Sequence, residues 1–185
     1  MQVPPFSFEK QLSEIGQDLE SAALRVINSG TYIGGVEVQN FEKSFADLVG
    51  VDFAIGCNSG TDALILALRA LGIGPGDEVL TASFTFFATA EAISSVGATP
   101  VFIDVDASNY LIDINLLQDA ITPATKAILP VHLFGCPVDM TKLVSFAREN
   151  GLSVIEDCAQ AAGAEWEGRP VGSLGDIGCF SFFPT

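Results

Sequence analysis

Residues 58–63 read Asn-Ser-Gly-Thr-Asp-Ala and connect a predicted strand to a predicted helix. Gly60 allows a close approach of the backbone, and Thr61 places a hydroxyl at the start of the helix. The free N–H groups of a first helical turn point toward whatever lies before it, and phosphate is their natural ligand. Ser, Thr and Asp are also common N-cap residues, so an ordinary helix cap explains the same pattern.

A second candidate for chemistry is the run 154–157, Val-Ile-Glu-Asp, an apolar strand that ends in two carboxylates. Buried carboxylates are costly unless they are paired. At the carboxyl end of a parallel strand they face the crevice in which α/β sheets bind ligands. The protonated pyridine nitrogen of pyridoxal phosphate (PLP) is the natural partner for Asp157 in a site for that cofactor. Capping of the following helix by Asp157 is the structural alternative.

Aromatic residues and the single histidine are weaker signals. The run 83–87, Ser-Phe-Thr-Phe-Phe, follows a predicted strand, and an aromatic ring there can stack on a planar ligand or simply pack in the core. His132 lies near the end of a predicted strand, where we expect a structural role. With one histidine and no serine elbow motif, a Ser/His/Asp hydrolase has little support.

Composition excludes several classes of function. The chain of 185 residues has a net charge of −15, which argues against binding to nucleic acid or to an anionic membrane surface. No apolar run is long enough to span a bilayer, and the N-terminus has no basic and apolar leader pattern, so we expect no membrane segment and no signal peptide. The four cysteines are far apart, which predicts no metal site and no disulfide framework and fits a cytoplasmic protein.

The elements that must position these residues follow from hydrophobic periodicity. Apolar residues at helical spacing predict helices over residues 7–29 and 36–49. Beyond residue 50, short apolar runs predict strands at 53–57, 78–82, 99–105, 127–133, 153–157 and 177–182. Helices are predicted between them at 61–71, 86–96, 114–121 and 140–150. Connections of this length predict a mostly parallel α/β sheet. We therefore expect an N-terminal helical segment (residues 1–50) and a ligand-binding domain (residues 51–185).

Taken together and in order, three runs of sequence resemble the DegT/DnrJ/EryC1/StrS family of PLP-dependent sugar aminotransferases. They are residues 58–106, residues 130–140 (Pro-Val-His-Leu-Phe-Gly-Cys-Pro-Val-Asp-Met) and residues 154–185. The resemblance covers nearly the whole chain. It implies the aspartate-aminotransferase fold (fold type I), in which a large domain of three α/β/α layers holds PLP.

The resemblance also implies a role for individual residues. The cofactor phosphate would be held by Gly60, Thr61, the backbone of Asp62 and the hydroxyl of Ser181. Phe86 matches the aromatic residue that stacks on the pyridine ring. Asp157 matches the partner of the pyridine nitrogen, and Gln160 matches the side chain that hydrogen-bonds the phenolic oxygen of the cofactor. The Schiff-base lysine is expected immediately after Thr185, beyond the sequence given, as is a C-terminal small domain.

The implied reaction is the transfer of an amino group from an amino-acid donor, usually glutamate, to a nucleotide-linked keto-sugar. Such reactions serve the synthesis of amino sugars, cell-surface polysaccharides and antibiotics. The family implies a homodimer in which each subunit completes the other's site. Two alternatives stay open: a non-catalytic or regulatory relative that binds PLP, and a PLP-dependent sugar dehydratase of the same fold. The identity of the residue after Thr185 distinguishes them.

Overall fold

The computed structural model describes residues 7–183 of the chain. The chain divides into two compact units, one formed by residues 7–48 and 52–56 and the other by residues 49–51 and 57–183. Each is described by itself. Within the described part of the chain, no helix has both the length and the apolar character needed to cross a bilayer.

The smaller unit contains helices α1 (Glu9–Ser29) and α2 (Val36–Val49), close to the predicted bounds. Helix α1 ends where Gly30 adopts a left-handed conformation with φ of 70°, which glycine tolerates because it has no Cβ. An ion pair of 3.3 Å joins Arg25 to Glu37 on α2. No residue of α1 is buried, and apolar residues on it such as Leu12 and Leu19 are exposed.

The predicted strand at 53–57 is wrong. This segment forms no strand, and Phe53 and Ile55 are each 83% exposed. The N–H group of Gly56 donates to Glu42 Oε1 at 2.7 Å, and the thiol of Cys57 donates to the carbonyl oxygen of Ser59 at 3.4 Å. The physical reason for the error is that a strand needs a hydrogen-bonded neighbour. Among the described residues no strand pairs with this segment.

The larger unit is built on five parallel strands in the order β2-β1-β3-β4-β7. Their bounds are Glu78–Ala82 (β1), Thr99–Ile103 (β2), Thr125–Leu129 (β3), Ser153–Asp157 (β4) and Ile177–Cys179 (β7). Strands β1 and β4 have the predicted bounds. The predictions for the others extended too far toward the carboxyl end. Strand β3 stops before Pro130, which has no N–H group to donate to a neighbouring strand.

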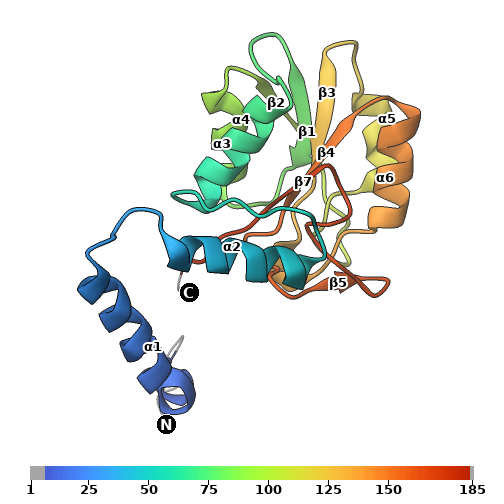
Figure 1. Ribbon diagram of the computed structural model, residues 1–185. Helices are drawn as coiled ribbons and strands as arrows, with labels where there is room; N and C mark the ends of the chain where they lie inside the picture. The colour runs from blue at the N-terminus through green and yellow to red at the C-terminus, as the bar shows by residue number, and fades with distance from the viewer. Residues whose placement is uncertain (1–6, 184–185) are drawn as a thin grey trace. The chain divides into compact units, whose positions relative to one another are not determined.

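Helices cover both faces of the sheet, giving the expected three layers (Figure 1). Helices α3 (Gly60–Ala70) and α4 (Phe87–Ser95) lie on one face, and α5 (Leu117–Ala120) and α6 (Met140–Glu149) lie on the other. The helix predicted at 114–121 is divided into a 3-10 turn, Ile114–Leu116, and the short α5. A second short 3-10 turn, η2, spans Leu133–Gly135. The small hairpin of β5 (Glu165–Trp166) and β6 (Arg169–Pro170) was not predicted.

The sheet interior is almost continuously apolar, as expected for strands covered on both sides. Residues Val79, Leu80, Ile128, Leu129 and Ile155 are fully buried. Burial of such side chains contributes on the order of 1.5–3 kcal/mol each. This packing holds the ends of the strands in place.

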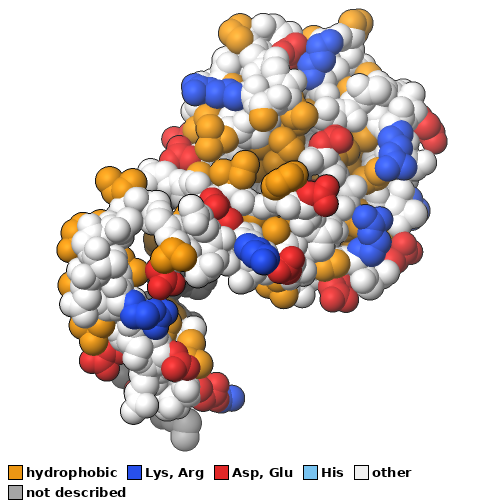
Figure 2. All heavy atoms as spheres, viewed as in Figure 1, with side chains coloured by type: hydrophobic (Ala, Val, Ile, Leu, Met, Phe, Trp, Pro, Cys, Tyr) orange, Lys and Arg blue, Asp and Glu red, His pale blue; other side chains and the backbone are white. Residues whose placement is uncertain are grey.

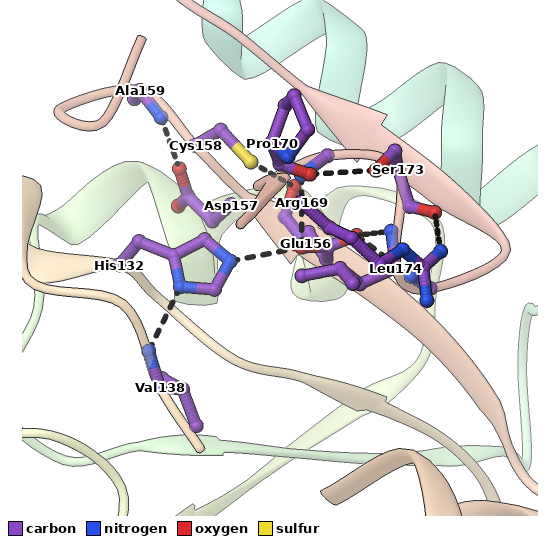
Figure 3. A network of polar contacts seen from close by, with 12 residues as sticks. His132, Val138, Glu156, Asp157, Cys158, Ala159, Arg169, Pro170, Ser173 and Leu174 are labelled. Atoms are coloured by element: carbon purple, nitrogen blue, oxygen red, sulfur yellow. Dashed lines mark hydrogen bonds and ion pairs between the residues drawn. The ribbon is translucent and has the colours of Figure 1, made fainter. Parts of the chain in front are cut away.

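One buried polar cluster interrupts this apolar interior (Figure 3). Glu156 on β4 accepts hydrogen bonds from His132 Nε2 at 3.0 Å and from the N–H groups of Gly172, Leu174 and Gly175 at 2.9, 2.8 and 2.7 Å. Both side chains of the His132–Glu156 pair are fully buried. The carboxylate of Glu156 therefore fastens the 172–175 loop to β4.

The tautomer of His132 follows from its neighbours. Its Nδ1 atom accepts a hydrogen bond from the N–H group of Val138 at 3.1 Å, so Nδ1 carries no proton in this geometry. The ring proton is on Nε2, where it is donated to Glu156 (Figure 3). The structural role expected for His132 is consistent with these two contacts.

The pKa of Glu156 reflects two opposing influences. Burial alone raises the pKa of this carboxyl group, because the low-dielectric interior disfavours a charge. The hydrogen bonds from His132 and from the N–H groups of Gly175, Gly172 and Leu174 outweigh burial, and the net pKa lies below the ordinary value. Glu156 therefore stays ionised inside the protein.

We predict that Glu156→Gln destabilises the protein by about 3–5 kcal/mol, because the amide NH₂ faces groups that are themselves donors. The lowered pKa of Glu156 gives a contribution to stability that is complete above the unfolded-state pKa of about 4.3 and lost as pH falls through the folded value. The variant should lack that part of the acid sensitivity. Chemical denaturation from neutral to acidic pH measures both effects.

The matched control is Glu165→Gln, on an exposed residue of β5, which should leave the free energy of unfolding nearly unchanged. If the Glu156 variant does not refold, hydrogen exchange at the amides of Leu174 and Gly175 in the native protein provides a second measurement. Slow exchange there in the variant would contradict an anchoring role for Glu156.

Candidate functional site

The candidate residues gather at the carboxyl edge of the sheet. Strand β4 ends at Asp157, and its parallel neighbour β7 ends at Cys179, which is directly opposite Asp157 in the register. Ser181 follows β7 by two residues, and Phe86 follows β1 in the connection to α4. Because parallel strands end at the same edge, the topology brings segments distant in sequence to one side of the sheet, where α/β proteins bind ligands.

Asp157 is held at the end of β4 with only 5% of its surface exposed. Its Oδ2 atom accepts a hydrogen bond from Thr89 Oγ1 at 3.0 Å, and its Oδ1 atom accepts one from the N–H group of Ala159 at 3.1 Å. Burial raises the pKa of Asp157, and the hydrogen bonds from Ala159 and Thr89 oppose that rise. Such a carboxylate is suited to a cationic partner.

The alternative role of Asp157 as a helix cap does not fit the structure. Turns lie at residues 159–160 and 162–163, and no helix begins between Asp157 and residue 183. The bond from the N–H group of Ala159 is a local turn contact instead.

The start of α3 forms a cradle suited to a phosphate. Ser59 precedes the helix in an extended conformation, and its Oγ accepts the N–H group of Asp62 at 3.1 Å. The N–H groups of Gly60 and Thr61 have no acceptor among residues 7–183. A Cβ atom added to Gly60 would lie 2.8 Å from the Cβ of Ser181, so only glycine allows this approach.

This geometry refines the expected phosphate contacts. Gly60 and Thr61 offer free N–H groups, and Ser181 offers a hydroxyl beside them. The N–H group of Asp62 already donates to the N-cap serine. Ser59 was not among the residues expected to contribute, although a serine directly before Gly60 is the usual signal for a cap.

Phe86 is 72% exposed and immediately precedes α4, so its ring is not part of the core. Its carbonyl oxygen accepts the N–H group of Thr89 at 3.1 Å. Thr89 also donates to Asp157, so this one residue connects the segment that carries the exposed ring to the buried carboxylate. An exposed ring at a strand end is available for stacking.

Gln160 is oriented by a neighbouring backbone group. Its Oε1 atom accepts the N–H group of Phe134 at 2.7 Å, which leaves its NH₂ group free to donate to a ligand oxygen. Phe134 has φ of 55°, a left-handed conformation that is uncommon for a bulky residue. Neither Phe134 nor Thr89 was expected from the sequence. The available signal for Thr89 was its position in the first turn of a helix, three residues after Phe86.

Residues His132, Glu156 and Cys158 lie close enough that their ligand atoms are all within 4.8 Å of one another. Their hydrogen bonds explain this cluster without a metal. Both ring nitrogens of His132 and both carboxylate oxygens of Glu156 are engaged. Burial also holds the pKa of the Cys158 thiol well above its ordinary value, which disfavours the thiolate that metals bind.

These groups fit a flat, phosphorylated ring with a basic nitrogen. The Gly60–Ser181 approach leaves a cradle for an anion, and the donors there are backbone N–H and hydroxyl groups. The buried carboxylate of Asp157 suits a protonated ring nitrogen, and the NH₂ group of Gln160 suits a ring oxygen. PLP carries all three features. Pro184, Thr185 and the lysine expected after them lie outside the described residues.

Comparisons with known proteins agree with this geometry. The chain is 50% identical over 183 residues to the UDP-N-acetyl-3-dehydro-alpha-D-glucosamine 3-aminotransferase of Acidithiobacillus ferrooxidans, covering 99% of this chain and 50% of that protein. The chain thus spans about half the length of the curated relative.

Solved structures are similar over nearly the whole chain. The crystal structure of S. venezuelae DesV in complex with a ketimine intermediate has a TM-score of 0.96 and 45% identity, and the match covers 99% of this chain and 49% of that chain. A Streptococcus pneumoniae protein assigned as a sugar aminotransferase, solved in a PLP form, has a TM-score of 0.84 and 30% identity, with 99% and 49% covered.

The family model described as the DegT/DnrJ/EryC1/StrS aminotransferase family matches residues 13–185. That match covers well over half of the chain, and the parallel three-layer fold and the matching structures agree with it. The chain belongs to the DegT/DnrJ/EryC1/StrS aminotransferase family.

Proposed function

We propose that the protein containing this chain is a PLP-dependent aminotransferase that moves an amino group from an amino-acid donor to a nucleotide-linked keto-sugar. The observation that carries this proposal is the buried carboxylate of Asp157 at the same sheet edge as the Gly60–Ser181 cradle. The similarity to an aminotransferase that acts on a UDP-linked sugar supports the substrate class. Glutamate is the donor that we propose, on the family resemblance.

We propose a role for each residue, taken from the family resemblance and supported by its position in the structure. The N–H groups of Gly60 and Thr61 and the hydroxyl of Ser181 bind the phosphate, which fixes one end of the cofactor without requiring a cationic side chain. Phe86 stacks on the ring face. Gln160 donates its free NH₂ hydrogens to the phenolic oxygen, because Phe134 occupies its Oε1 atom.

The proposed role of Asp157 is to keep the ring nitrogen of the cofactor protonated. When bound, PLP supplies an electron sink that stabilises negative charge on the carbon bearing the amino group. The carboxylate of Asp157 holds a proton on the ring nitrogen and thereby maintains that capacity. The surrounding burial strengthens the interaction, since few water molecules compete for the charge.

We also propose that the protein is a homodimer and that it is cytoplasmic. Apolar residues of α1 such as Leu12, Ile15 and Leu19 are exposed. Figure 2 shows hydrophobic side chains at the surface of this helix. A contiguous apolar stripe of this kind needs a cover, and a second copy supplies one. All four cysteines are free thiols, which supports a reducing compartment.

The first test of the proposed function is Asp157→Asn in the product of the open reading frame that contains this chain. A neutral amide cannot hold the proton on the ring nitrogen. Loss of an ionic hydrogen bond of about 1.5–3 kcal/mol in the transition state corresponds to a decrease in kcat on the order of 10- to 100-fold. PLP should be retained. Transaminase kinetics and the visible absorption spectrum measure the two effects.

Asp119→Asn, on an exposed residue of α5, is the matched control and should behave as wild type. Turnover near the wild-type value in the Asp157 variant would show that this carboxylate is structural. A protein that binds PLP but transfers no amino group would instead favour a regulatory relative, and loss of a sugar hydroxyl would favour a dehydratase.

A second prediction tests the phosphate cradle. Gly60→Ala places a Cβ atom 2.8 Å from the Cβ of Ser181, and the two segments must separate. Loss of one phosphate hydrogen bond should weaken PLP affinity on the order of 10- to 100-fold. Titration followed by absorbance measures the dissociation constant. In the control Gly74→Ala the new Cβ meets its nearest neighbour at an ordinary 3.6 Å, so affinity should not change.

A third prediction concerns the oligomeric state. Sedimentation at micromolar concentration should give twice the chain mass. Leu12→Lys with Leu19→Lys should shift the equilibrium toward monomer, because two charges would enter the apolar contact. Gln17→Lys, on the polar face of the same helix, is the control. Dimers that persist with both lysines would place the interface away from α1.

A further inference from the structure

Thr89 has a buried hydroxyl whose partner lies on a different element. The residue lies in the first turn of α4 and is fully buried. Its Oγ1 atom is 3.0 Å from Asp157 Oδ2 and 2.9 Å from Thr85 Oγ1. A threonine in a helix commonly satisfies its hydroxyl on a carbonyl of the preceding turn. Thr89 instead contacts a carboxylate 68 residues away in sequence.

The direction of the hydrogen bonds can be assigned. A hydroxyl has one proton, and an ionised carboxylate only accepts. Thr89 therefore gives its proton to Asp157 and must accept from Thr85 in the contact between the two hydroxyls. The result is an ordered chain from Thr85 through Thr89 to Asp157. Such chains strengthen the terminal bond, because each bond polarises the next.

Thr89 is also connected to the neighbouring stacking residue. Its N–H group donates to the carbonyl oxygen of Phe86 at 3.1 Å. One residue thus touches both the connection that carries the exposed ring and the carboxylate at the end of β4. A shift of Thr89 would change the position of the carboxylate relative to that ring.

We infer that Thr89 is a positioning residue, which fixes the orientation of the Asp157 carboxylate and favours its ionised form toward the ring nitrogen of PLP, with Thr85 as its support. The inference rests on the proposed function for the identity of the partner of Asp157. It deepens that proposal, since the presentation of the carboxylate is assigned to a hydroxyl that touches no ligand. Without Thr89, one oxygen of Asp157 loses the one side-chain donor recorded among residues 7–183.

Asp157 has other titratable groups around it, and assigning a positioning role to Thr89 changes the role of none of them. The titratable neighbours of Asp157 are His132, Cys158, Cys179 and the adjacent Glu156, whose side chain projects to the other face of the sheet. Burial raises the pKa of the Cys179 thiol to about 12, so it remains protonated. Burial also raises the pKa of Asp157, and the bonds from Ala159 and Thr89 are the local contacts that lower it. Of these two donors, only Thr89 can be removed by a side-chain substitution.

The decisive variants are Thr89→Val, which replaces the hydroxyl by a methyl group of similar size, and Thr89→Ser, which keeps the hydroxyl. Thr81→Val is the matched control. Thr81 is equally buried, and its hydroxyl donates to the carbonyl oxygen of Leu129 at 2.8 Å, away from Asp157. A purely structural loss of a buried hydrogen bond should therefore be similar in the two valine variants.

The first measurement is a ¹³C NMR titration of the Asp157 carboxyl carbon in the cofactor-free protein from the full open reading frame. Thr89→Val should raise the pKa of Asp157 by about one to two pH units, which corresponds to the loss of a hydrogen bond to a charged group. Thr89→Ser and Thr81→Val should leave it unchanged. If Thr89→Val fails to fold, Thr85→Val should give a smaller rise in the same direction.

The second measurement is made on the PLP-loaded protein. Thr89→Val should lower kcat on the order of 10-fold, with recovery in Thr89→Ser and no loss in Thr81→Val. An Asp157 pKa that is the same in both valine variants would overturn the inference, as would full turnover in Thr89→Val. A protein that never binds PLP would refute the proposed function instead, and the NMR titration would still report on the Thr89–Asp157 contact.

Discussion

The site depends on the burial of two adjacent carboxylates at the end of one strand. Glu156 and Asp157 follow each other on β4, so their side chains project to opposite faces of the sheet. Neither charge would be tolerated there without partners. Glu156 is satisfied by His132 and three backbone N–H groups, and Asp157 by Thr89 and Ala159. These donors allow both charges to be buried at the end of β4.

The two carboxylates differ in what their contacts leave available. The carboxylate of Glu156 accepts hydrogen bonds from Gly172, Leu174 and Gly175, and these bonds fasten the 172–175 loop to β4 (Figure 3). The two donors to Asp157 leave further lone pairs for a cationic partner. A rigid, saturated anchor beside a partly satisfied carboxylate is a suitable arrangement for holding a charged ring nitrogen. Precise placement matters because the strength of such bonds decreases steeply with poor geometry.

The net negative charge of the chain does not conflict with the phosphate site that we propose at the start of α3. Its net charge is −15, yet the cradle at the start of α3 uses backbone N–H groups and a hydroxyl. These are local dipoles whose effect falls off within a helical turn, so the distant acidic residues have little influence on them. The close approach of Gly60 to Ser181 brings together the two segments that we propose bind the phosphate.

The sequence by itself determined the elements whose signals are local. The apolar runs predicted the bounds of β1 and β4, and helical periodicity predicted those of α2. These patterns are local, because a strand buried on both faces or a helix with one apolar stripe shows it in consecutive residues. The family and the α/β class were likewise readable from the order of motifs. The predicted strand at 53–57 failed because pairing depends on a neighbour that no local pattern supplies. Only the tertiary structure decided that Thr89 meets Asp157 and that Phe134 meets Gln160. These contacts join segments far apart in the chain, and they exist because parallel strands bring their carboxyl ends to one edge.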